Sequence, residues 1–100
     1  MERTHRTSFD EALQRLLTEP SYAAQTLIVT ARMLELDAAQ PVTGTARENA
    51  FDIAIATILT PLPEVVHNES RDRAREAFPP LTPISRGEYA LQLRDAAKGL

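Results

Sequence analysis

The sequence contains no cysteine and no tryptophan, a single lysine (Lys98) and only three glycines. Without cysteine the chain has no disulfide, no thiolate metal site and no cysteine nucleophile. The scarcity of glycine argues against a meander of tight hairpins. No apolar run of about 18 residues is present, so no transmembrane helix is expected. The polar start, Met1 to Arg6, is followed by no apolar stretch, so we expect no secretory signal and a cytoplasmic protein.

The composition is that of one globular domain. The 100 residues are 43% hydrophobic and 25% charged, so we expect one domain over residues 1–100, with residues 1–7 as a disordered N-terminal tail. The formal charge of −3 and the pI of about 5.3 disfavour a general basic surface for nucleic acid. Arginine supplies ten of the eleven basic residues and alanine occurs fifteen times, a bias towards GC-rich codons that suggests a bacterial source.

Apolar residues recur at helical spacing in five segments separated by proline or glycine. We therefore predict helices over residues 9–18, 20–39, 46–60, 63–78 and 86–98. The fold class that follows is all-α, a compact bundle of four to five helices. Its central helical hairpin pairs residues 20–39 with residues 46–60. A strand over residues 51–59 is the competing prediction. If the segment is helical, its core face comprises Phe51, Ala54, Ile55, Ile58 and Leu59.

Three helix starts carry the pattern of a capping box. In this motif a Ser or Thr side chain accepts from an early backbone amide, and a Glu three residues later reaches back towards the cap. The three pairs are Ser8 with Glu11, Thr45 with Glu48, and Ser85 with Glu88.

The sequence contains two Glu-x-x-His pairs, Glu2/His5 and Glu64/His67. Helical di-iron sites use such pairs. One pair lies at a chain end and the other beside a proline break, so we expect solvated side chains, no metal and no cofactor. His67 is the only histidine away from the N-terminal end, so any histidine catalysis would fall on it, with Glu64 to orient the ring. We expect a protein that is not an enzyme.

The segment 20–39 has too many apolar residues for one buried face. Its core stripe comprises Ala24, Leu27, Ile28, Ala31, Leu34 and Ala38. The apolar residues off that stripe are the interface candidates Tyr22, Val29, Met33 and Leu36. An apolar patch on a soluble domain usually meets a partner, and a two-fold homodimer is the commonest assembly. The sequence therefore predicts a small accessory or regulatory protein that acts through protein–protein contact, as a homodimer or with another chain.

Two alternatives from other classes stay open. One is a small-molecule-binding or enzymatic bundle with a pocket between helices, lined by Tyr22, Met33, Glu64, His67 and Tyr89. The other is a DNA-binding regulator that uses the Arg-rich fourth helix. A face on which Arg71, Arg75, Arg86 and Arg94 gather clear of acids would favour DNA.

Overall fold

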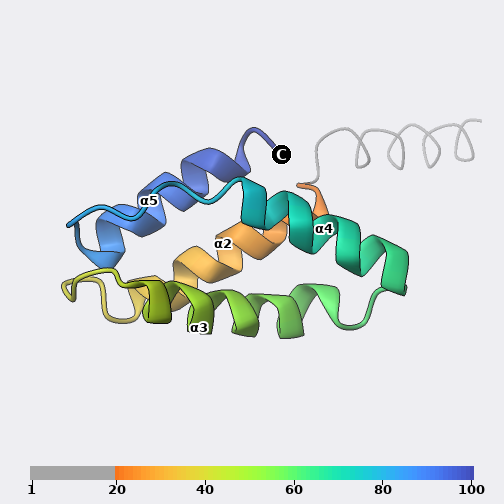
Figure 1. The fold of residues 1–100 in the computed structure, drawn as a ribbon, viewed down its shortest axis with the longest axis horizontal. Helices are drawn as coiled ribbons and strands as arrows, with labels where there is room; N and C mark the ends of the chain where they lie inside the picture. Colours follow the sequence, from red (N-terminus) through yellow and green to blue (C-terminus); the bar gives the residue numbers. More distant parts are fainter. Residues whose placement is uncertain (1–19) are drawn as a thin grey trace, which may run out of the picture.

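Helix α2 (Tyr22–Glu35) is the central element of the bundle. The computed structural model describes residues 20–100. In it, α3 (Gly44–Ala54), α4 (Glu64–Glu76) and α5 (Arg86–Ala97) all contact other helices, and α2 lies between α5 and α3 (Figure 1).

The predicted all-α bundle is confirmed for this part of the chain. The α2–α3 hairpin is antiparallel, as Figure 1 shows, and α4 also packs on α2. Residues 51–59 are helical, so the competing strand prediction is wrong. The predicted tail, the helix over 9–18, its Ser8/Glu11 box and the Glu2/His5 pair lie outside the described residues. No helix within residues 20–100 is both long enough and apolar enough to cross a bilayer.

The N-terminus of α2 is fixed by Ser21, whose hydroxyl accepts a hydrogen bond from the Ala24 amide at 3.1 Å. The prediction that this helix continues to residue 39 is wrong, because it ends at Glu35 and passes into a turn. The Ala38 carbonyl accepts from the Gly87 amide at 2.9 Å. A β-carbon on Gly87 would lie 3.1 Å from the Ala38 β-carbon, so glycine permits this close approach.

Two threonines of α2 are buried although each carries a polar hydroxyl group. Thr26 and Thr30 are both fully buried. Their hydroxyls donate to backbone carbonyls one turn earlier, at 2.7 Å for Tyr22 and 2.8 Å for Thr26. This local bond satisfies the hydroxyl, and the methyl group then packs as an apolar group. Burial therefore extends further round α2 than its apolar residues alone indicate.

The start of α3 corrects one capping prediction. The N-cap is Thr43, whose hydroxyl accepts from the Ala46 amide at 3.0 Å. Thr45 lies exposed in the first turn, and Glu48 bonds Arg75 instead, at 3.0 Å. The Thr45/Glu48 box is wrong because a Thr of equal capping ability stands two residues earlier.

We expect Thr43→Ala to destabilise the protein by about 0.5–2 kcal/mol, because the amides at the start of α3 lose their acceptor. Thr45→Ala is the matched control: it removes the same hydroxyl from an exposed site and should change the free energy of unfolding by less than about 0.5 kcal/mol. Urea denaturation of both variants measures the difference. Equal losses would show that Thr43 is not the cap.

Helix α3 does not continue as an α-helix to residue 60. It passes into one π-helical turn, η1 (Ile55–Leu59), closed by a bond from the Thr60 amide to the Ile55 carbonyl at 3.0 Å. The wider turn changes the phase of the side chains. Leu59 is fully buried, whereas Ile55 and Ile58, which the sequence predicts in the core, are only partly buried.

Helix α4 starts after Pro63 and ends at Glu76, before the proline-rich segment of residues 79–83. That segment leads into α5, whose predicted Ser85/Glu88 box is present: the Ser85 hydroxyl accepts from the Glu88 amide at 3.1 Å and lies 3.2 Å from the Glu88 carboxylate. A short pairing joins this segment to the α2–α3 loop, with the Val42 amide donating to the Ile84 carbonyl at 3.0 Å.

The core lies where the helices meet. Its largest fully buried apolar side chains come from every helix except α4: Leu27, Phe51, Leu59, Tyr89 and Leu93. Helix α4 contributes the small residues Ser70 and Ala74 to the interior, and most of its other residues are polar, apart from Val65 and Val66 in its first turn.

Candidate functional site

A stripe of apolar side chains runs along the outer side of α2. It comprises Tyr22, Val29, Met33 and Leu36, and we call these four residues the α2 stripe. At about 3.6 residues per turn they fall within roughly 60° of the helix circumference. Tyr22 is 46% exposed and Leu36 is 76% exposed, while Val29 and Met33 are partly exposed. The stripe therefore presents apolar area at the surface along the whole length of α2.

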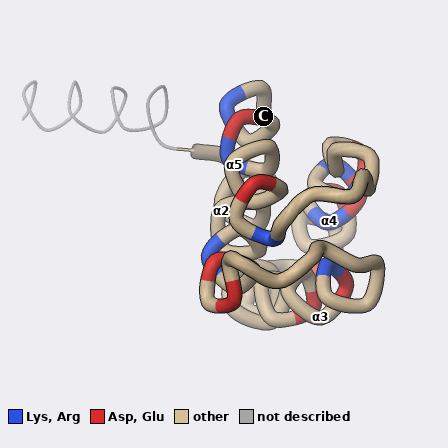
Figure 2. Tube along the Cα trace, turned by 90° about the vertical axis from the view of Figure 1, so that its left-hand side faces the viewer, with Lys and Arg blue, Asp and Glu red and all other residues tan. Residues whose placement is uncertain are grey.

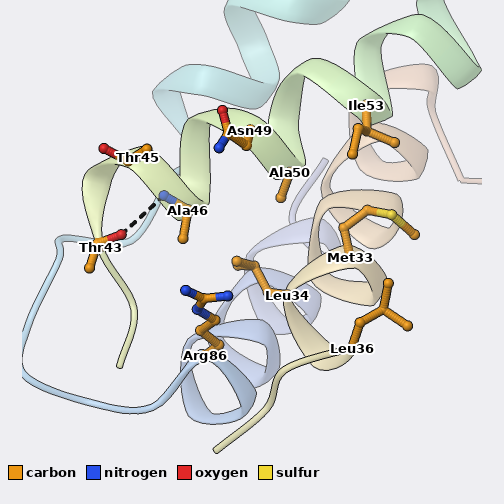
Figure 3. Close-up of a pocket in the computed structure, with 10 residues that line it drawn as sticks. All are labelled: Met33, Leu34, Leu36, Thr43, Thr45, Ala46, Asn49, Ala50, Ile53 and Arg86. Carbon is orange, nitrogen blue, oxygen red and sulfur yellow. Dashed lines mark hydrogen bonds between the residues drawn. The ribbon is translucent and has the colours of Figure 1, made fainter. Parts of the chain in front are cut away.

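The α2 stripe leads into a shallow groove at the C-terminal end of α2. The groove has a volume of about 290 Å³ and is open to solvent. Its apolar lining comes from α2 and α3, namely Met33, Leu34, Leu36, Ala46, Ala50 and Ile53, and its polar lining from Thr43, Thr45, Asn49 and Arg86. Figure 3 shows the Met33, Leu36 and Ile53 side chains on one side of the groove. Ile53 is 48% exposed, so this end of the surface is also apolar.

Arg86 borders the groove but is already bonded. Its Nε donates to the Pro41 carbonyl at 3.2 Å, and its Nη1 lies 3.6 Å from the Asp37 carboxylate. The guanidinium thus ties the start of α5 to the α2–α3 loop and fixes one wall of the groove.

The catalytic candidates from the sequence analysis, His67 and Glu64, do not line the groove. The His67 Nδ1 lies 3.1 Å from the Leu59 carbonyl oxygen, so this nitrogen is engaged with the π-helical turn. Glu64 is exposed in the first turn of α4. Among residues 20–100, no group of three or more His, Cys, Asp or Glu side chains is arranged to hold a metal ion.

The five residues expected around a ligand pocket are not brought together in the groove. Only Met33 lines it. Tyr89 is fully buried, and its hydroxyl donates to the Pro79 carbonyl at 2.7 Å. Tyr89 therefore holds the proline-rich segment against the bundle.

The arginines that would favour DNA are paired with acids. Each of the four has a carboxylate within reach: Arg71 with Asp72, Arg75 with Glu48, Arg86 with Asp37, and Arg94 with Glu35. Figure 2 shows basic and acidic positions interspersed along the described helices. These pairs neutralise much of the field that a DNA backbone would meet.

A cluster of arginine and aromatic side chains, which the sequence analysis missed, joins α3 to the end of α4. The Phe51 and Phe78 rings meet edge to face with centroids 4.8 Å apart. The Arg47 guanidinium lies 4.8 Å from the Phe78 centroid, and that of Arg75 lies 4.9 Å from the Phe51 centroid. Glu48 bonds Arg75 between them. These contacts hold the helices together, and the two halves of the cluster, residues 47–51 and residues 75–78, are too far apart in sequence to form a recognisable motif.

The α2 stripe and the groove are thus the candidate functional surface in residues 20–100, and the lining of the groove includes no His, Asp or Glu side chain. In the comparisons with known proteins, no protein-family model, no curated protein and no solved structure matches this chain.

Proposed function

We propose that this protein acts through protein–protein contact and that its first partner is a second copy of itself, bound along the α2 stripe. The observation that carries the proposal is a line of four apolar residues at the surface of α2, of which Tyr22 and Leu36 are exposed and Val29 and Met33 are half-buried. Isolated apolar side chains are normal on a protein surface, but a contiguous apolar patch usually has a partner.

The spacing of the stripe is self-complementary. Tyr22, Val29 and Leu36 stand seven residues apart, and Met33 follows Val29 by four, which is the spacing of a coiled-coil seam. Val29 is the midpoint. Two copies packed antiparallel about a two-fold axis at Val29 would place Tyr22 of one copy beside Leu36 of the other. A two-fold interface needs such a surface, because each copy presents the same residues to its partner.

The groove enlarges this contact at the Leu36 end. In the antiparallel arrangement it lies next to Tyr22 of the second copy, and its apolar wall of Met33 and Ile53 suits an aromatic side chain. We therefore expect most of the binding energy to come from the two ends of the stripe, where each groove receives a Tyr22 ring.

The proposal is tested by introducing one charged side chain into the stripe and measuring the affinity of the dimer. Leu36→Glu and Met33→Glu should weaken the dimer by several kcal/mol per dimer, because each interface would desolvate two unpaired carboxylates. Sedimentation velocity over a range of concentrations gives the dissociation constant of each variant.

The chain offers a matched control. Val65 on α4 is 76% exposed, the same fraction as Leu36, and does not belong to the stripe. Val65→Glu adds the same charge in place of an equally exposed apolar side chain, so it should leave the dimer unchanged. Equal effects of Leu36→Glu and Val65→Glu would rule out the stripe as the interface.

A further inference from the structure

The two sides of the α2 stripe differ in polarity. At about 100° per residue, Gln25 and Arg32 lie about 40° and about 60° to one side of Val29, whereas Met33 lies about 40° to the other side. Arg32 is exposed and Gln25 is half-buried, so both side chains border the stripe at the surface. We call Gln25 and Arg32 the polar flank. The opposite side is apolar, because Met33 continues into the groove.

The polar flank offers a hydrogen-bond acceptor and a donor on the same side of α2. The Gln25 Nε2 donates to the Pro20 carbonyl at 3.0 Å, which holds the amide group and leaves its Oε1 to accept from another molecule. The Arg32 guanidinium carries several N–H donors, and it forms no ion pair with a carboxylate of residues 20–100. Both groups are therefore available to a partner that lies on the stripe.

We infer that the polar flank sets the orientation of the dimer: the Arg32 guanidinium of each copy donates to the Gln25 Oε1 of the other copy, which makes the two α2 helices antiparallel. This inference rests on the proposed function, since it names the polar residues that orient the proposed interface.

The antiparallel arrangement brings these two groups together. Its two-fold axis is perpendicular to both helices, so the polar flanks of the two copies lie on the same side of the interface. Arg32 stands three residues after Val29, and Gln25 stands four residues before it. With the axis at Val29, Arg32 of one copy and Gln25 of the other are displaced by only one residue, or about 1.5 Å, along the helices. The symmetry gives the dimer two such contacts.

A parallel arrangement separates the same groups. Its two-fold axis runs along the helices, so the polar flank of one copy faces the apolar side of the other. Arg32 would then lie beside Met33 of the second copy, where its charge would lose water without gaining an acceptor. The difference in polarity between the two sides of the stripe therefore favours the antiparallel orientation.

The absence of cysteine allows the orientation to be measured in the full-length chain, since introduced thiols are the only ones present. Chains with Gln25→Cys are mixed with chains that carry Arg32→Cys and a tag of different mass, and a short thiol–thiol cross-linker is added. In the antiparallel dimer the two Gln25 positions lie about 12 Å apart along the helices, and the two Arg32 positions about 9 Å apart. We therefore expect the mixed product to form about tenfold faster than either product of two identical variants. Equal rates would overturn the inference.

The contact between Arg32 and Gln25 is tested by a change of charge. The chain has a net charge of −3, so an added carboxylate should disfavour self-association unless it meets a cation. Gln25→Glu places a carboxylate opposite Arg32 of the second copy, so it should lower the dimer dissociation constant about fivefold at low salt. Sedimentation velocity measures this constant, and circular dichroism confirms that the variant is folded.

Gln92→Glu on α5 is the matched control for this change. Gln92 is exposed and lies on the side of α5 opposite to Arg94, the residue that bonds Glu35 of α2. The same added charge at this position should leave the dissociation constant unchanged or raise it. A dimer that Gln25→Glu weakens, or leaves as Gln92→Glu does, would overturn the inference.

A third cysteine variant separates this inference from the proposed function. Val29→Cys lies on the two-fold axis and should join two copies in either orientation, faster than Val65→Cys, whose thiol is exposed on α4. If Val29→Cys behaves in this way but the mixed pair gains no rate over the identical pairs, the stripe is the interface and the orientation is wrong. If Val29→Cys and Val65→Cys react equally slowly, the proposed function is wrong and this inference falls with it.

Discussion

Phe51→Ala is expected to destabilise the protein by about 3–5 kcal/mol, the largest loss of any substitution considered. The Phe51 side chain is fully buried between α3 and its neighbours, so its removal leaves a cavity that the bundle closes only in part. The change also removes the ring that packs edge to face on Phe78 and faces the Arg75 guanidinium. Urea denaturation at constant pH measures the loss.

The matched control lies two residues further along the same helix. Ile53 is 48% exposed at the groove, so Ile53→Ala removes a large apolar side chain without creating a buried cavity. Its cost in the isolated monomer should stay below about 1 kcal/mol. Similar losses for the two variants would mean that α3 is rotated relative to the structure described.

Leu59→Ala carries the second largest expected loss, about 2–5 kcal/mol, and it tests the π-helical turn. Leu59 is fully buried because η1 brings it to the inner face, whereas Ile55, four residues earlier, is only partly buried. The sequence analysis assumes the constant phase of a regular α-helix and places both Ile55 and Leu59 in the core, so it does not predict this difference in burial.

The comparison with Ile55→Ala is therefore decisive for the turn. We expect that variant to lose clearly less free energy of unfolding than Leu59→Ala does, since part of the Ile55 side chain remains in water in the folded state. Thermal or urea denaturation of both variants gives the order of the two losses. The reverse order would contradict the π-helical turn.

The helical fold could be predicted from local signals. Apolar residues at helical spacing indicated where each described helix lies, and Ser85 marked the start of α5 because its hydroxyl bonds within the same turn. Prolines 61, 63, 79 and 80 correctly indicated the breaks between the last three helices. This signal is also local, because proline fixes its own φ angle and lacks a backbone N–H.

Most of the wrong predictions concern features that local sequence patterns do not determine, such as contacts between residues distant in the sequence. Helix α2 ends early, at the turn that contacts Gly87 of α5. No residue near position 35 allows that contact, or the end of the helix, to be predicted from the sequence. Thr26 and Thr30 are buried because a hydroxyl bonded to its own helix can enter a core, which a simple apolar–polar pattern does not register. The π-helical turn shifts the phase after Ile55, and periodicity analysis assumes a constant phase.

The candidate surface was partly predictable. Tyr22, Val29, Met33 and Leu36 were identified because they are apolar and lie off the core stripe of their helix, which is a property of one segment. The groove joins side chains of α2 and α3 with Arg86 of α5, so it depends on how three segments pack. The arginine–aromatic cluster was missed for the same reason.

The central claim is that the α2 stripe binds a second copy of the chain, and sedimentation equilibrium of the unmodified protein tests it most directly. We predict an apparent mass that rises with concentration from that of the 11.1 kDa chain towards twice that value, with half-conversion in the micromolar range. An apparent mass that stays at 11.1 kDa up to about millimolar concentration would contradict the claim.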